Sequence, residues 1–220
     1  MAVITISREF GSEGSLVAEK TARALGYHLA DKQTLEAILR ADGAVPEFQR
    51  EYASIPGFWE RFDLRRMERR QGVIESLNRA ILALAQHGNM VIVGRGGFSV
   101  LKGLADVFHV RIQAPLPVRI RRVTELPEAT VPSRAERFIL ENDRIQRSFI
   151  ESVYGVPWDT AKPFDLVLDT GKIAPDLAAG WLVQAVQAMP GGGFTAAGLE
   201  VDPVFAARVN GIFHCEAHAA

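Results

Sequence analysis

The side chains best suited to chemistry in this sequence are arginines that follow short, apolar, β-branched runs. Arg8 comes two residues after the run at 3–6, and Arg95 stands between two glycines soon after the run at 90–93. If these runs are parallel strands, their carboxyl ends meet at one edge of a sheet, where open α/β sheets bind ligands. A planar guanidinium group can donate two parallel hydrogen bonds to a phosphate. We therefore expect an anion-binding site at this edge.

Each of these two arginines also has a simpler interpretation. Arg8 could lie against phosphates that are being transferred, or it could form an ion pair with Glu9 or Glu13. Arg95 could hold the phosphate of an acceptor, because its flanking glycines let the backbone approach closely, or it could pair with Asp106 or Asp31.

A second set of arginines stands where a lid over such a site would be. Its members follow the run at 107–112 and continue along a long helical stretch: Arg119, Arg122, Arg144 and Arg147. On that stretch the basic positions share one face, and Phe138, Ile145 and Phe149 share the opposite face. The basic face could close over clustered anions and stabilise a charged transition state. The alternative is a solvated helix surface that Glu141 partly neutralises.

The loop after the first run carries an altered form of a phosphate-binding loop. The standard loop reads G-x-x-x-x-G-K-[ST] and surrounds phosphates with backbone N–H groups and a lysine. Here Arg8 stands at the first glycine and Gly14 at the lysine, so the loop contains no lysine. The residues expected around a nucleotide phosphate are Gly11, Ser12, Glu13, Gly14 and Ser15. Ser12 or Ser15 could offer a hydroxyl to phosphate or Mg²⁺, Ser15 being the candidate metal ligand; alternatively the loop is a plain strand–helix turn.

Asp31 ends a short second run, where a sheet of this kind begins its acceptor site. Its carboxylate could bind Mg²⁺ through water or accept a hydrogen bond from a ribose hydroxyl. It could equally cap a helix that begins near residue 32.

Short apolar runs that alternate with helical patterns must position these side chains. The predicted strands are 3–6, 27–30, 90–93, 107–112 and 164–168, and the predicted helices are 15–25, 62–87, 116–124, 133–153 and 174–189. Continuously apolar strands between helices indicate a parallel sheet that is covered on both faces. We therefore predict a three-layer α/β fold with a five-stranded parallel sheet flanked by helices, plus a helical lid.

Composition narrows the classes of function. The chain has 220 residues and a net charge of -1, so no global charge attracts polymeric nucleic acid or a membrane. A single cysteine, Cys215, excludes a disulfide framework and favours the cytoplasm. No apolar run approaches the length of a transmembrane helix, and the N-terminus lacks the layout of a signal peptide. We expect a cytoplasmic protein whose partners are small molecules.

The ordered set of segments resembles the P-loop nucleoside-monophosphate kinases. Residues 3–31, VITISREFGSEGSLVAEKTARALGYHLAD, are similar to the opening of bacterial cytidylate kinases. VIVGRGG at 91–97 is similar to their third strand and Gly-Arg turn, and residues 108–123 to their fourth strand and arginine-bearing helix. Asp143, Arg144 and Arg147, followed by FDLVLDT at 164–170, resemble the end of the lid and the fifth strand. The variant loop SREFGS, with VGRG and YGVPWD, looks closer still to the cytidylate kinase-like family.

This resemblance implies a P-loop NTPase-type fold and phosphoryl transfer from ATP, with Mg²⁺, to a nucleoside monophosphate, CMP or dCMP being favoured. It divides the chain into a kinase-like domain at 1–189, with an acceptor-binding insertion at about 32–88 and a lid at about 119–153, and a peripheral C-terminal tail at 190–220. Gly96 stands where that family has an aspartate that helps to hold cytidine, and Gly14 and Leu16 replace its lysine and threonine. These departures motivate two alternatives, a nucleotide-binding regulatory pseudo-kinase and a P-loop kinase of a non-nucleotide metabolite.

Overall fold

A five-stranded sheet forms the centre of the molecule, and every neighbouring pair of strands in it is parallel. The computed structural model describes residues 2–41, 67–125 and 131–216, so residues 42–66 of the expected acceptor-binding insertion lie outside the described part. The strands are β1 (Val3–Arg8), β2 (His28–Ala30), β3 (Met90–Val93), β4 (Val107–Gln113) and β5 (Leu166–Asp169), in the spatial order β2-β3-β1-β4-β5. The predicted three-layer fold of the P-loop NTPase type is therefore confirmed.

Strand β1 lies between β3 and β4 and contributes to the core on both faces of the sheet. Val3 packs into the cluster beneath α4 and α9, whereas Ile4 and Ile6 pack beneath α1 and α8, as the alternation of side chains along a strand requires. Gly94 N donates a hydrogen bond of 2.8 Å to the carbonyl oxygen of Ile6. The turn after β3 therefore begins level with the end of β1, which sets Arg8 beside that turn.

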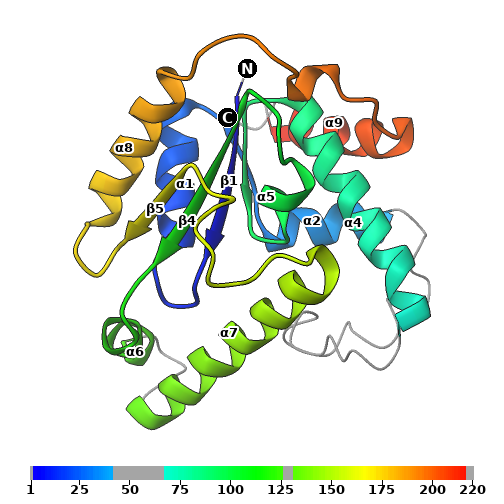
Figure 1. The fold of residues 1–220 in the computed structure, drawn as a ribbon. Helices are drawn as coiled ribbons and strands as arrows, with labels where there is room; N and C mark the ends of the chain where they lie inside the picture. The colour runs from blue at the N-terminus through cyan, green and yellow to red at the C-terminus, as the bar shows by residue number, and fades with distance from the viewer. Residues whose placement is uncertain (1, 42–66, 126–130, 217–220) are drawn as a thin grey trace.

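Helices cover both faces of the sheet (Figure 1). On one face α1 (Gly14–Leu25) packs against α8 (Pro175–Gln187), and on the other lie α4 (Met67–His87), α5 (Gly97–Val100) and α9 (Pro203–Glu216). A short helix, α2 (Lys32–Ala41), follows β2 and packs against α4. Leu77, Ile81 and Leu84 of α4 are fully buried, as the apolar stripe of that segment predicts.

Two helices form the part of the chain predicted to be a lid. Helix α6 (Leu116–Thr124) packs on α7 (Pro132–Tyr154), and Val123, Ala135 and Ile139 make a small apolar cluster between them. Phe10 of the first loop joins this cluster and meets Phe138 edge to face, with 5.1 Å between ring centroids. Helix α7 runs across the molecule near the carboxyl ends of the strands (Figure 1). The lid helices are therefore packed onto the loop that follows β1.

The segment after α8, which lies within the predicted C-terminal tail at 190–220, contains two elements that pack on the rest of the domain. A short 3-10 turn, η2 (Ala196–Gly198), and helix α9 both pack against α4. Phe205, Val209 and Phe213 of α9 are buried in the larger core cluster. Their four-residue spacing places all three on one helix face, and that face covers apolar surface of α4 which would otherwise meet water.

Candidate active site

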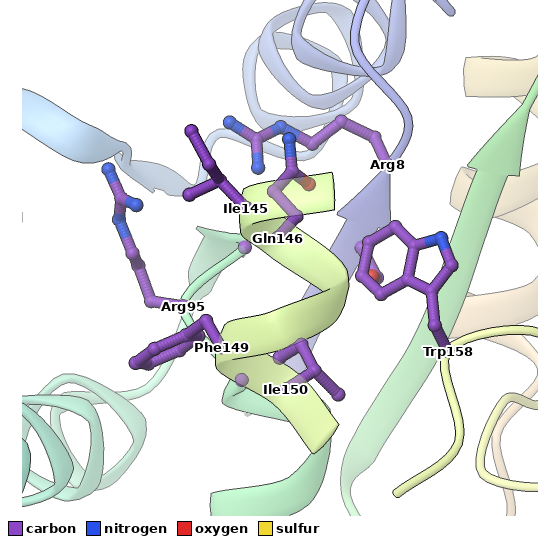
Figure 2. Close-up of a pocket in the computed structure, with 10 residues that line it drawn as sticks. Arg8, Arg95, Ile145, Gln146, Phe149, Ile150 and Trp158 are labelled. Carbon is purple, nitrogen blue, oxygen red and sulfur yellow. The ribbon is translucent and has the colours of Figure 1, made fainter. Parts of the chain in front are cut away.

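A small pocket lies where β1 and β3 end, beneath helix α7 (Figure 2). It is lined by Ser7, Arg8, Gly94, Arg95, Gly96, Ile145, Gln146, Phe149, Ile150 and Trp158. The pocket thus brings together both strand-end arginines that the sequence singled out, and one turn of the lid helix covers them. Its cavity volume is about 40 Å³, which is room for only a few water molecules, because one water needs about 10–15 Å³ of such space.

Arg8 spans the distance between the first loop and the turn after β3. A Cβ atom placed on Gly14 would lie 2.5 Å from Arg8 Cβ, and one placed on Gly94 would lie 2.5 Å from Arg8 Nη1. Both glycines are therefore needed for the Arg8 side chain to take this path. Desolvation lowers the pKa of the Arg8 guanidinium, and Asp31 opposes this effect. Among the residues that the structure describes, none forms a hydrogen bond or ion pair with the Arg8 guanidinium.

Arg95 lies in an unusual backbone conformation at the same edge. Its φ is 59°, and those of Gly94 and Gly96 are 74° and 75°, so three successive residues are left-handed. Only Arg95 among them bears a Cβ, and a left-handed residue with a side chain is strained. The pKa of Arg95 lies well below its ordinary value, first because of desolvation and second because of Arg8, while Glu36 and Asp31 act in the opposite direction. Guanidinium groups nevertheless stay charged in proteins, so two like charges converge here with little water.

Hydrogen bonds to backbone carbonyl oxygens fix the conformation of the first loop. Ser12 is fully buried and its hydroxyl donates to the carbonyl of Glu9 at 2.8 Å, while Thr170 Oγ1 donates to the carbonyl of Ser12 at 2.6 Å. Ser12 therefore has a structural partner, whereas Ser15 lies exposed in the first turn of α1. The first N–H groups of a helix have no partners within the helix and are available to an anion.

The other residues predicted for this loop pack against the lid. A Cβ atom on Gly11 would lie 3.1 Å from Val123 Cγ2 and 3.2 Å from Arg119 Cβ, so α6 lies directly on the loop. Glu13 is left-handed, with φ 59°, and pairs with Arg122 at 2.7 Å. The predicted catalytic residue Arg122 is thus brought to the loop, where it is already engaged by a carboxylate.

Arg119 belongs to a buried network of charges that sequence reasoning did not find. Its Nη1 donates to Asp143 Oδ2 at 2.6 Å, and its Nε lies 3.6 Å from Glu9 Oε2. Glu9 Oε1 also lies 3.9 Å from Nη2 of Arg111, a buried arginine of β4. The only available signal for Arg111 is an arginine within an otherwise apolar strand.

Arg111 links this network to the pocket. Its Nη1 donates to the carbonyl oxygen of Trp158 at 2.5 Å, and its guanidinium carbon lies 4.6 Å from the centroid of the Trp158 ring. Burial lowers the pKa of Arg111, and Glu9 opposes this effect. A guanidinium over the face of an aromatic ring is attracted by the ring's quadrupole. Arg111 therefore holds Trp158 in place as one wall of the pocket.

Three more of the predicted site residues face other partners. Arg144 is 74% exposed and pairs with Glu141 at 2.7 Å, which raises the pKa of Arg144. Arg147 pairs with Asp159 at 3.2 Å, also at the surface. Asp31 Oδ1 accepts a hydrogen bond of 3.0 Å from Thr34 N, so Asp31 acts as a helix cap while also exerting a charge on Arg8 and Arg95.

The donor set of the site suits phosphate groups more than a metal ion held by protein side chains alone. In the part of the chain that the structure describes, no group of three or more His, Cys, Asp or Glu side chains could hold a metal ion. Magnesium in phosphoryl-transfer sites is held by one or two protein oxygens, the substrate phosphates and water, so it needs no such group. Ser15 is the available hydroxyl at the start of α1. The described helices include none that is long and apolar enough to span a membrane.

Comparison with known proteins identifies a family for this chain. Residues 3–172 match the model of the cytidylate kinase-like family. The cytidylate kinase of Pyrobaculum aerophilum is 28% identical over 176 residues, which are 79% of this chain and 86% of that protein. The cytidylate kinase of Ignicoccus hospitalis is 27% identical over 176 residues, covering 80% of this chain and 94% of that protein.

Solved structures show the same fold at lower identity. An uncharacterized protein from Eubacterium ventriosum superposes with a TM-score of 0.68 at 19% identity, covering 86% of this chain and 99% of that one. The protein TT1252 from Thermus thermophilus gives a TM-score of 0.52 at 19% identity, covering 86% and 98%.

Proposed function

The chain belongs to the cytidylate kinase-like family, and from that premise we propose that it transfers the γ-phosphoryl group of ATP to a nucleoside monophosphate, with CMP or dCMP as the favoured acceptor. Its relatives include proteins described as cytidylate kinases, which supports a reaction of this class. We place the reaction in the cytoplasm, on small nucleotide substrates, without polymeric nucleic acid or membrane.

The observation that carries the proposal is the convergence of Arg8 and Arg95. Desolvation lowers the pKa of both guanidinium groups, and the charge of Arg8 lowers the pKa of Arg95 further; Arg8 has no hydrogen-bond or ion-pair partner among the described residues. Placing like charges together away from water is unfavourable unless an anion joins them. A phosphate with two negative charges would offset both positive charges and accept hydrogen bonds from charged donors.

The position of each group in the fold suggests its role in the reaction. The exposed amides at the start of α1 bind the phosphates of ATP. Arg95 holds the phosphate of the acceptor, and Arg8, between Gly14 and Gly94, lies between donor and acceptor. An oxygen of the acceptor phosphate attacks the γ-phosphorus, the bond from that phosphorus to the bridging β-phosphate oxygen breaks, and ADP leaves. Arg8 stabilises the charge on the transferring oxygens, as positioned cations do in phosphoryl transfer. Bound Mg²⁺ would supply further positive charge to the phosphates, with Ser15 as its protein ligand.

Helix α7 has to change position during this cycle. A cavity of about 40 Å³ cannot admit a nucleotide while Ile145, Phe149 and Ile150 line it. We propose that α7 moves away to admit substrates and returns to exclude water from the reaction. Arg119 and Arg122 then keep the first loop and the lid together, and Arg144 and Arg147 would enter the site only through such a rearrangement of α7.

An assay of ADP release with a panel of nucleoside monophosphates tests this proposal. We expect turnover that depends on both ATP and an acceptor and is fastest with CMP or dCMP. No turnover with any monophosphate at high enzyme concentration would overturn it.

One observation favours a second candidate, a nucleotide-binding protein without fast chemistry. The Glu13 carboxylate lies just before α1 and forms an ion pair of 2.7 Å with Arg122. Its negative charge competes there with a bound phosphate. Calorimetric titration separates the candidates, because tight binding of ATP or CMP without turnover would support this one.

A further inference from the structure

Tyr154, the last residue of α7, lies directly on the turn that carries Arg95. A Cβ atom on Gly96 would overlap the Tyr154 ring, so the ring packs against the bare backbone of the turn. Tyr154 is mostly buried, and its ring also meets Phe149 edge to face, with 5.8 Å between centroids. The end of the lid helix and the arginine turn are therefore in contact through this one side chain.

The hydroxyl of Tyr154 joins three elements. It lies 3.0 Å from Asn78 Oδ1 on α4 and 3.3 Å from the carbonyl oxygen of Arg95, and it can donate its proton to either. Burial raises the pKa of Tyr154, so the hydroxyl keeps its proton at neutral pH. No other function assigned above uses this group.

Arg95 needs an external restraint to keep its conformation. It is the residue with a Cβ in a run of three left-handed residues, and such strain persists only where the surroundings fix it. One of the two acceptors within reach of the Tyr154 hydroxyl is the carbonyl oxygen of Arg95 itself, so donation to it acts on the strained residue directly. Backbone hydrogen bonds of Gly94, Gly97 and Ser99 hold the rest of the turn, so loss of the Tyr154 hydroxyl would loosen the Arg95 carbonyl in particular.

We propose that Tyr154 is a positioning residue for Arg95, which holds the acceptor-binding arginine in its left-handed conformation and makes that conformation depend on the docked end of α7. The inference rests on the proposed function in taking Arg95 as the ligand of the acceptor phosphate. Tyr154 touches neither substrate in this assignment and acts through Arg95. Acceptor binding is thereby coupled to the docked end of α7, and this coupling through Tyr154 does not involve the start of α1, where ATP binds.

Tyr154→Phe tests this role because it removes only the hydroxyl and leaves the ring on Gly96. We expect the KM for the acceptor to rise about five- to tenfold, as for the loss of one hydrogen bond, while the KM for ATP stays within twofold. Tyr27→Phe is the matched control, because Tyr27 stands before the amino end of β2, away from the carboxyl ends of the strands, and packs in the other core. We expect the control to leave both KM values unchanged.

A purely structural role for Tyr154 predicts a different result. Lower thermal stability with equal changes in both KM values, or with no change in either, would overturn the inference while the proposed function stands. Calorimetric titration with CMP gives a readout that does not need turnover. If the wild-type protein binds CMP but transfers no phosphoryl group, weaker CMP binding by Tyr154→Phe alone supports the inference although the proposed function fails. If the wild-type protein neither turns over nor binds CMP, both fail.

Discussion

Replacing Arg8 by methionine should make the protein more stable and far less active. The unbranched methionine side chain keeps the carbons that pass Gly14 and removes the charge that ends beside Gly94. Because Arg8 has no hydrogen-bond or ion-pair partner among the described residues, its removal leaves no protein group unsatisfied. It also removes the like charge that opposes Arg95.

The size of both effects follows from the environment of the guanidinium. A desolvated polar group without a partner costs about 1–3 kcal/mol, and more when it is charged. Arg8 keeps some contact with solvent, so we take about 1–2 kcal/mol as the gain in the free energy of unfolding. For a chain of this length each kcal/mol raises the midpoint of thermal unfolding by about 2–4 °C. Loss of one positioned charge donor from a transition state lowers kcat by about 10²–10³-fold.

Thermal unfolding and the ADP-release assay measure the two effects on the same preparation. Arg23→Met is the matched control, because Arg23 is an exposed arginine of α1 that pairs only with Glu19 among the described residues. The control should leave the unfolding midpoint and kcat close to those of the wild type. A fall in the stability of Arg8→Met by more than about 1 kcal/mol would show that Arg8 is a structural ion-pair partner, and unchanged kcat would remove it from the reaction.

Three further substitutions test other parts of the site. Arg122→Met should lower stability by about 1 kcal/mol, because Glu13 loses a partly buried partner, and should raise the KM for ATP several-fold; unaltered kinetics would contradict the role of Arg122 at the loop. Arg144→Met should leave the unfolding midpoint and kcat near their wild-type values, because the pair with Glu141 is exposed; a loss of kcat above tenfold would show that Arg144 enters the site. Burial lowers the pKa of His109 from 6.5, so the unfolded chain binds the proton more tightly and stability should fall as the pH drops below that value. His109→Asn should remove this dependence while keeping a hydrogen bond with Thr5, and urea unfolding at pH 7.5 and 5.5 would measure it.

The fold was predictable where local pattern determines structure. The run at 3–6 has apolar residues on both faces, as expected for a strand that is covered on both sides. Strand β1 contains this run. The burial of α9 was not predictable in the same way. Phe205 and Val209 have helical spacing, but their partners lie on α4, more than a hundred residues earlier in the chain. The local pattern predicts an apolar helix face, but the surface which that face covers is known only from the assembled fold.

The site shows the same division. The convergence of Arg8 and Arg95 follows from their places at the ends of strands, because parallel topology brings those ends to one edge. The choice of ion-pair partners does not follow from local sequence. Glu9 faces Arg119 and Arg111, which lie on other elements. Glu9 and Glu13 were the expected partners of Arg8 because they are close in sequence, but in the fold they pair with Arg119 and Arg122. The catalytic assignments of the lid arginines stay predictions.

The two departures from a standard phosphate-binding loop are one coupled change. Any side chain at position 14 would begin 2.5 Å from Arg8 Cβ and 3.0 Å from Arg8 Cγ. A lysine at position 14 and an arginine at position 8 therefore exclude each other unless the backbone moves, whereas the glycine that normally stands at position 8 leaves room for the lysine. The loss of the lysine alone would not account for the cation at the strand end or for the missing Cβ at Gly94, beside which the Arg8 guanidinium lies. In the proposed site the positive charge therefore stands at the end of the strand instead of the start of the helix, and the glycines at 14 and 94 leave the space that the Arg8 side chain occupies.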